Sequence, residues 1–245
     1  MRIARIATRT GQHHVVQDSD RWLEIVDPFA TPPRFTGSEY PVGTARLLAP
    51  VEPLVVLGMA HNGPGDRELP RQAFLKSPRT VIGPDDDILV DERLGQVNIE
   101  GELAVVIRHR CRNLTPEQVP GAILGFTIGN DVTAVDQVAF DEKMTQSKNG
   151  DGFTPIGPWI ETDLDASVVP ITVHVNGEEQ ASASTADLAW SITEQLVYLT
   201  SYLSLGPGDV VLSGAPGTFT PVKPGDHGAI TLGGIGTLSN PVRAR

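Results

Sequence analysis

The chain has 245 residues, of which 40% are hydrophobic and 20% are charged, as expected for a globular protein with a sizeable core. Its formal net charge of −11 argues against nucleic acid as a partner, because phosphate binding needs a basic surface. The same charge argues against attraction to an acidic membrane face. No apolar run approaches the ~20 residues needed to span a bilayer. We therefore expect neither a nucleic-acid partner nor a membrane partner.

The content of cysteine, glycine and proline indicates the compartment and the class of fold. Cys111 is the only cysteine, so no internal disulfide can form, which fits a reducing compartment. The first six residues alternate in polarity instead of forming the apolar block of a signal peptide. We therefore expect a cytoplasmic protein. The 25 glycines and 20 prolines favour a β-rich fold with many turns over a helical bundle.

Residues 1–48 are expected to form a small β-rich N-terminal unit. Short apolar segments within residues 3–26 predict strands, because glycine and polar residues separate them. The four prolines at positions 28, 32, 33 and 41 predict a linker. We place the main domain at residues 49–245.

Several elements of the main domain can be predicted from pattern. Short β-branched runs predict strands at residues 54–58, 124–129, 171–175 and 210–212. Asn176-Gly177 predicts a hairpin after the third run, since both central residues of such a turn need positive φ. Ser191 and Glu194 have the spacing of a capping box, and the apolar residues after them recur at helical spacing. They predict a helix that ends before Gly206.

The longest apolar run begins with two carboxylates. Residues 97–107 read VNIEGELAVVI, which predicts a buried strand. Alternate side chains of a strand share a face, so Glu100 and Glu102 point the same way, roughly 7 Å apart along the chain. Such a pair is either solvated where the strand meets the surface, or it holds a hard divalent cation through its oxygens.

Two further polar segments are candidates for a site. Asp131 follows the strand predicted at residues 124–129, where an acidic residue is either a turn former or a ligand. The segment from His61 to Glu68 follows a core strand and is rich in glycine and proline, and loops in such positions often carry function. A loop histidine is more often a surface or packing residue than a catalytic base. Both interpretations of His61 stay open at this point.

Six motifs, taken in order, resemble those of the fumarylacetoacetate hydrolase family. They lie at residues 100–107, 129–133, 148–153, 155–159, 175–178 and 207–212, within a match that covers roughly residues 54–242. In that family the Glu-x-Glu pair and the aspartate of the Asn-Asp motif bind Mg²⁺ or Mn²⁺. By resemblance, the metal ligands are Glu100, Glu102 and Asp131. Three carboxylates without cysteine or clustered histidine form the oxygen-only site that such hard cations prefer.

The resemblance also implies a chemistry. Family substrates are 2-oxo or 1,3-dicarbonyl carboxylates that chelate the metal, which draws charge onto the carbonyl oxygen as an enolate develops. Lys148 matches the family's active-site lysine, and Lys76 matches a common family position that we assign to substrate binding. Asp151 is a further candidate contact with the substrate. Gly214 and Ala215 lie in a glycine-rich run whose backbone amides can face an anionic ligand.

Two departures from the family pattern bear on the reaction. Hydrolytic members carry a His-x-x-Glu dyad on a mobile lid that activates water, but residues 58–63 read GMAHNG here and that spacing is missing. His61 with Glu68 substitutes for the dyad only if the loop folds back. An arginine and a threonine that are usual in the family are Val135 and Ala215 here, so we expect an unusual distal substrate pocket.

The resemblance implies an α+β fold that is mainly β, with the family's mixed β-roll or barrel as catalytic domain, and a homodimeric assembly. The expected activity is Mg²⁺-dependent hydrolysis of a C–C bond in an acylpyruvate-like or fumarylacetoacetate-like carboxylate. Isomerisation of a hydroxyheptadienedioate, and decarboxylation or tautomerisation of oxaloacetate, stay open, and the missing dyad shifts weight toward them. An inactive member with a binding or structural role is the alternative from a different class. Retention of Lys148 and the three ligands argues against it.

Overall fold

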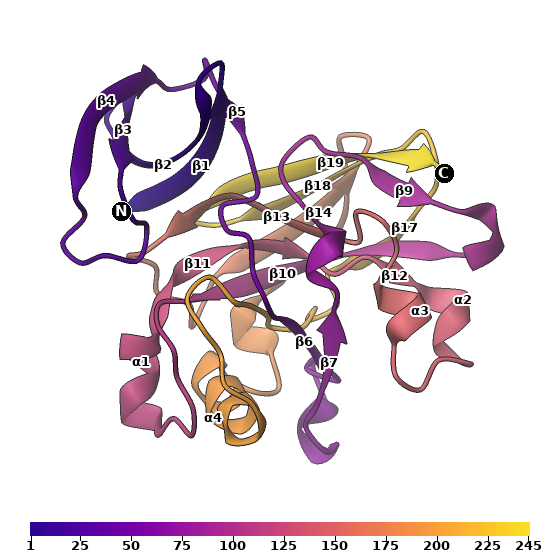
Figure 1. The fold of residues 1–245 in the computed structure, drawn as a ribbon. Helices are drawn as coiled ribbons and strands as arrows, with labels where there is room; N and C mark the ends of the chain where they lie inside the picture. The colour runs from indigo at the N-terminus through magenta and orange to yellow at the C-terminus, as the bar shows by residue number, and fades with distance from the viewer.

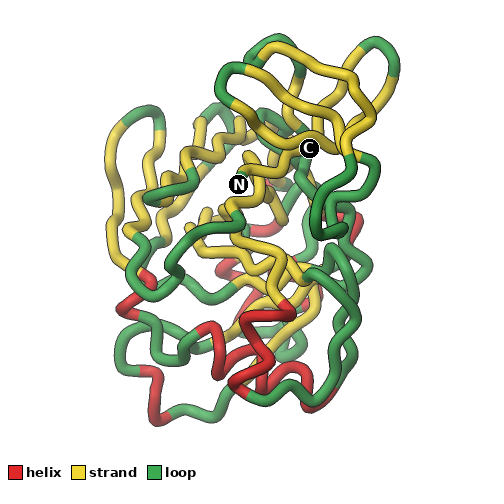
Figure 2. Tube along the Cα trace, turned by 90° about the vertical axis from the view of Figure 1, so that its left-hand side faces the viewer, coloured by secondary structure: helices red, strands yellow, loops and turns green.

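The computed structural model describes residues 1–245. Two β-sheets make up most of the molecule, and short helices lie at their ends (Figure 1). The helices gather on the lower side in two perpendicular views, opposite the N-terminal strands (Figures 1 and 2). None of the helices is both long enough and apolar enough to cross a lipid bilayer. The α+β, mainly β fold class predicted from the sequence is confirmed.

The larger sheet contains 14 strands and joins the N-terminal residues to the main domain. Its continuous order is β4 (Phe35–Pro41), β3 (Arg21–Ile25), β2 (Gly11–Asp18), β1 (Arg2–Thr8), β13 (Thr154–Glu161), β11 (Ile123–Asn130), β10 (Val97–Ile107), β16 (Val210–Leu212), β6 (Val56–Ala60) and β7 (Gln72–Lys76). Four short strands pair alongside this path: β5 (Arg46–Leu47), β8 (Val81–Ile82), β12 (Thr133–Ala134) and β17 (Phe219–Val222).

The second sheet has five strands, in the order β15 (Glu178–Ser184), β14 (Pro170–Val175), β18 (His227–Leu232), β19 (Gly236–Ala244) and β9 (Ile88–Val90). The α-helices are α1 (Val119–Ala122), α2 (Val135–Val138), α3 (Thr145–Lys148) and α4 (Ile192–Tyr202). Single 3₁₀ turns are η1 (Asp66–Glu68), η2 (Pro78–Thr80), η3 (Glu92–Leu94), η4 (Pro116–Gln118) and η5 (Thr185–Asp187).

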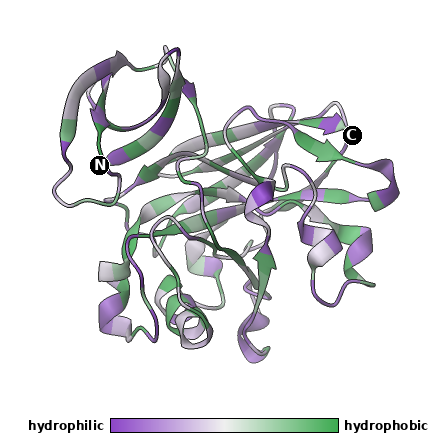
Figure 3. Ribbon diagram, in the orientation of Figure 1, coloured by the Kyte–Doolittle hydropathy of each residue, from purple (hydrophilic) through white to green (hydrophobic).

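Strand β10 is buried on both faces, which explains its unbroken apolar run. Leu103 and Val105 belong to the main core of 30 buried residues, which includes side chains of β14, β18 and α4. Ala104 and Val106 belong to a second core cluster with residues of β1, β13 and β16. Hydrophobic residues accordingly concentrate in the central strands, whereas the outer loops are hydrophilic (Figure 3). Strand β10 is therefore held rigidly on both sides.

Several predicted elements of the main domain are confirmed. Helix α4 begins after the predicted capping box, in which Ser191 Oγ accepts from the Glu194 backbone and Glu194 Oε2 accepts from the Ser191 backbone. The hairpin between β14 and β15 turns at Asn176 and Gly177, whose φ values are 55° and 84°. Both features could be predicted because a capping box and an Asn-Gly turn each depend on only a few consecutive residues.

The linker predicted in the N-terminal unit is wrong in part. Residues 35–41 form β4, which pairs antiparallel with β3, placing Tyr40 opposite Trp22. Because β4 is an edge strand, it tolerates Pro41 at its end. Strand β1 pairs with β13 through Ile3 and Ile160, so the N-terminal strands continue the larger sheet. The division of the chain at residue 48 stays a prediction.

Two Pro-Gly-Asp turns differ in burial and offer a matched test of stability. Asp209 is buried, and its carboxylate accepts hydrogen bonds from the backbone of Leu54, Val55 and Gly206 at 3.2, 2.8 and 2.6 Å. It thereby joins the turn before β16 to the segment before β6. Asp226 closes the corresponding turn in a half-buried position, where it accepts from the Lys223 backbone and from the Asn176 side chain, both at 2.9 Å.

We predict that Asp209→Ala lowers the free energy of unfolding by about 3 kcal/mol, because three partly buried backbone donors lose a buried carboxylate acceptor. Asp226→Ala should lower it by only about 1 kcal/mol, since water can replace the lost acceptor. Urea denaturation of both variants checks this. Equal losses would contradict the role assigned to Asp209.

Candidate metal centre

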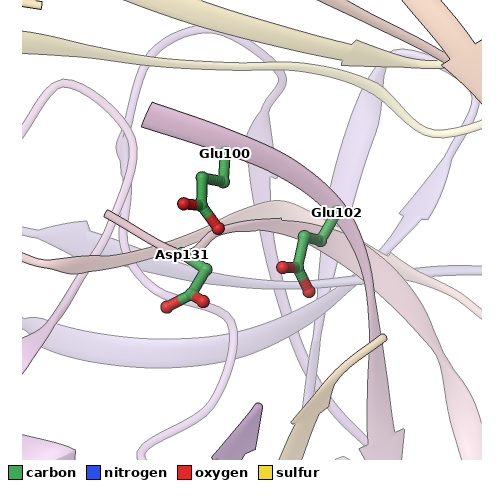
Figure 4. A group of neighbouring side chains, drawn as sticks. All are labelled: Glu100, Glu102 and Asp131. Atoms are coloured by element: carbon green, nitrogen blue, oxygen red, sulfur yellow. The ribbon is translucent and has the colours of Figure 1, made fainter. Parts of the chain in front are cut away.

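The pairing of β10 with β11 brings three carboxylates together. Glu102 lies opposite Gly129 in this antiparallel ladder, and the backbone amide of Asp131 donates to the Glu100 carbonyl at 3.0 Å. Each of Glu100, Glu102 and Asp131 offers a carboxylate oxygen, and these oxygens lie within 4.8 Å of one another. Figure 4 shows the three side chains pointing toward a common point. The spacing within β10 and the strand-end position of Asp131 produce this cluster.

Crowding of these carboxylates makes them hard to ionise together. Burial raises the pKa of Glu102 well above its ordinary value, and the charges of Asp131 and Glu100 raise it further. Burial likewise raises the pKa of Glu100. An added cation would relieve this repulsion and favour the charged forms. An oxygen-only donor set of this kind fits a hard divalent cation such as Mg²⁺ or Mn²⁺.

Lys76 supports the cluster from inside the protein. Its ammonium group is fully buried, donates to Asp131 Oδ1 at 2.5 Å and donates to the Phe153 carbonyl at 2.7 Å. Burial lowers the pKa of Lys76, although the Asp131 carboxylate opposes that effect. The structure therefore places Lys76 behind Asp131, where its positive charge compensates a buried carboxylate.

Lys148 reaches the cluster from the opposite side, at the end of α3. Its ammonium group donates to Asp131 Oδ2 at 2.5 Å, to Thr133 Oγ1 at 2.6 Å and to Glu100 Oε2 at 3.2 Å. Burial alone would lower the pKa of Lys148, but the carboxylates of Asp131 and Glu100 hold it above its usual value. Lys148 is therefore a fixed positive charge at the edge of the centre.

Helix α3 is held in place by a carboxylate that sequence reasoning missed. Asp141 is buried and accepts from the backbone and the hydroxyl of Ser147 at 2.8 and 2.9 Å. This cap fixes the residue directly before Lys148. No pattern in the sequence marks it, because Asp141 precedes α3 and five residues separate it from Ser147.

The centre lies in a cavity of about 770 Å³. His61 and Ala215 line it together with Lys148 and the three carboxylates. The backbone amide of Gly214 donates to Glu102 Oε2 at 2.6 Å. Of the residues predicted to contact substrate, Gly214 thus contacts a carboxylate of the cluster and Ala215 lines the cavity.

Glu68 and Asp151 lie apart from the lining of this cavity. Glu68 is exposed on η1, so the structure does not bring it to the cavity wall that His61 shares. Asp66 does line the cavity, and it accepts from the Gly63 backbone at 2.8 Å. Asp151 is exposed and pairs with Arg245 at 3.2 Å. The pairing of His61 with Glu68 as a catalytic dyad stays a prediction.

The loop that carries His61 is anchored on two sides. The Asn62 side chain is buried, donates to the Ser213 carbonyl at 2.6 Å and accepts from the Trp190 backbone at 2.6 Å. Arg67 pairs with Glu194 at 2.7 Å and stacks on the Trp190 ring with its guanidinium carbon 4.0 Å from the centroid. Hydrogen bonds from Arg67 lower the pKa of Glu194 to about 2. The loop is therefore tied to β16 and to the start of α4.

Protein-family models and known proteins match nearly the whole length of this chain. The model of the fumarylacetoacetate (FAA) hydrolase C-terminal domain matches residues 46–243, and the Rv2993c-like N-terminal model matches residues 1–50. Protein Rv2993c of Mycobacterium tuberculosis is 37% identical over 99% of this chain and 98% of its own length. Maleylpyruvate hydrolase of Aquipseudomonas alcaligenes is 32% identical over 70% of this chain and 59% of its own length.

A solved structure is also similar to this one over its whole length. The structure of 5-carboxymethyl-2-hydroxymuconate delta-isomerase from Mycobacterium smegmatis is similar to this one with a TM-score of 0.95, at 38% identity and with 100% of both chains covered. The matched domain model and the full-length relative together establish that this chain belongs to the fumarylacetoacetate hydrolase family.

Proposed function

We propose that this protein is a Mg²⁺-dependent or Mn²⁺-dependent enzyme that acts on a 2-oxo or 1,3-dicarbonyl carboxylate. The observation that carries the proposal is the convergence of Glu100, Glu102 and Asp131 within 4.8 Å, at the wall of a cavity that Lys148 also lines. An inactive structural protein has no need for such a cluster, whose repulsion opposes folding.

The three carboxylates and the two lysines have different roles in the proposed reaction. Glu100, Glu102 and Asp131 would hold the divalent ion, which would supply Lewis-acid stabilisation to the 2-oxo carboxylate group of the substrate. Lys148 exchanges its longest hydrogen bond, the one to Glu100 at 3.2 Å, for a hydrogen bond to the substrate oxygen that gains negative charge, and its bonds to Asp131 and Thr133 keep the ammonium group in place. Lys76 binds no substrate in this scheme and keeps Asp131 ionised from behind.

Hydrolysis of a C–C bond is the first candidate reaction. Water adds to the distal carbonyl carbon, the adjacent C–C bond breaks, and its electron pair moves onto the half that carries the 2-oxo carboxylate. A proton then returns to carbon 3 of that half. His61 lines the cavity and is the candidate base for the water. The relationship to a maleylpyruvate hydrolase supports this reaction.

Isomerisation is the second candidate reaction, favoured by the position of Glu68 outside the cavity lining. Moving a proton between two carbons of an enolised 2-oxo acid needs no attacking water. The 38% identity to a delta-isomerase over the whole chain supports it equally. Both reactions use the same carboxylates and the same lysine, so the roles above hold for either.

We also propose that the protein acts as a homodimer in the cytoplasm. The dimer is what the family resemblance implies, and Leu54 and Phe140, each 87% exposed, are apolar side chains that a subunit interface would cover. A sedimentation velocity experiment tests the assembly, and a monomer at micromolar concentration would contradict it. Fractionation of the source cells tests the compartment, and recovery outside the cytoplasm would contradict it.

We predict that Glu102→Gln weakens Mn²⁺ binding by about 10-fold or more, because the neutral amide removes charge from one of three ligands. Isothermal titration of the metal-free protein with Mn²⁺ measures this. Glu92→Gln, at an exposed position on η3, is the matched control and should bind normally. Unchanged affinity in Glu102→Gln would remove that residue from the metal centre.

We predict that Lys148→Ala leaves Mn²⁺ affinity undiminished, because it removes a competing cation from beside Glu100 and Asp131. Its kcat on a reactive acylpyruvate should fall by about 10²-fold to 10³-fold, as for other donors that act on developing negative charge. Loss of metal affinity together with a normal residual kcat would instead make Lys148 a structural partner of the carboxylates.

A further inference from the structure

The cavity outside the carboxylate cluster has an apolar wall. The side chains that form it come from β6, β7, α2, β17 and the residue before α3: Met59, Phe74, Val135, Val138, Met144 and Phe219. Met59 and Phe74 are buried close to the cluster, whereas Val138 and Phe219 are 42% and 53% exposed. The wall therefore extends from the inner end of the cavity toward solvent, where exposed apolar surface often marks a binding site.

Positive charge is scarce along the same wall. Lys148 is the only lysine or arginine among the lining residues, and its ammonium group is already bonded to Asp131, Glu100 and Thr133. Asp66 adds a further negative charge to the lining. A carboxylate packed against these apolar side chains would lose water without gaining a charged partner from them.

Two arginines, Arg67 and Arg71, follow the cavity-lining segment 61–66 in the chain, and both are engaged elsewhere. The guanidinium carbons of Arg67 and Arg71 lie 4.0 and 3.9 Å from the centroid of the Trp190 ring. Both also face Glu194, at 2.7 and 3.9 Å. Neither lines the cavity, so neither supplies a bidentate partner for a second carboxylate.

We infer that the substrate carries one carboxylate, which lies at the metal centre, and an uncharged apolar substituent that packs against the wall formed by Phe74, Val138 and Phe219. The enzyme then selects 2-oxo monocarboxylates with an apolar tail over dicarboxylates of the same length. This inference rests on the proposed function, because it requires the 2-oxo carboxylate group to bind at the carboxylate cluster.

A matched pair of unreactive ligands tests the inference. 2-Oxohexanoate and 2-oxoadipate have the same carbon chain and differ only in a terminal methyl group or a terminal carboxylate. Isothermal titration of the Mg²⁺-loaded full chain should show 2-oxohexanoate binding at least about 10-fold more tightly. Pyruvate, which has the shared 2-oxo carboxylate group and no tail, should bind more weakly than 2-oxohexanoate.

The outcomes separate this inference from the proposed function. If pyruvate and both longer acids fail to bind, the proposed function is wrong and the inference falls with it. If they bind and 2-oxoadipate binds as tightly as 2-oxohexanoate or more tightly, the inference is overturned while the proposed function stands.

A charge placed on the wall gives a second readout. Val138 is partly exposed at the end of α2, so a longer polar side chain can be accommodated there. Val138→Lys should reduce the preference for 2-oxohexanoate over 2-oxoadipate by about 10-fold, because it offers the second carboxylate a cation. The uncharged Val138→Gln should preserve most of the preference. Equal ratios in the two variants would show that ligand tails do not reach this wall.

Discussion

Repulsion among three carboxylates is the constraint on which the rest of this structure depends. Glu100, Glu102 and Asp131 meet within 4.8 Å in a largely buried place, and such a group persists only if positive charge compensates it. Lys76 and Lys148 each place an ammonium group 2.5 Å from a different oxygen of Asp131. When all three carboxylates are ionised, the two lysines leave one negative charge, which a bound cation would compensate.

The fold supplies the rigidity that this arrangement needs. Strand β10 carries two of the carboxylates and is packed on both faces, by the main core and by the smaller cluster beside β1 and β13. Its neighbour β11 delivers Asp131 in register. Polar side chains hold the two segments that carry the candidate catalytic residues: Asp141 fixes α3 ahead of Lys148, and Asn62 fixes the loop at His61. A rigid strand pair thus holds the charges, while capped loops surround them.

Local chemistry explains what the sequence could predict. The period of two along a strand places Glu100 and Glu102 on one face, and capping and turn residues predict α4 and the hairpin at Asn176. The family resemblance added Asp131 and Lys148 as site residues. What could not be predicted depends on distant pairings: the burial of Lys76 beneath Asp131 comes from the meeting of β7 and the end of β11. The apolar wall likewise joins Phe74 and Phe219, which lie far apart in the chain. The strand at residues 35–41 escaped prediction because its partner β3, not its own pattern, defines it.

The central claim is that the three carboxylates hold one divalent ion, and crystallography with an anomalous scatterer tests it most directly. A crystal of the full chain soaked in Mn²⁺ should show one strong anomalous peak within bonding distance of oxygens from Glu100, Glu102 and Asp131, with Lys148 beside it. A peak elsewhere, or none at this cluster at saturating Mn²⁺, would contradict the account.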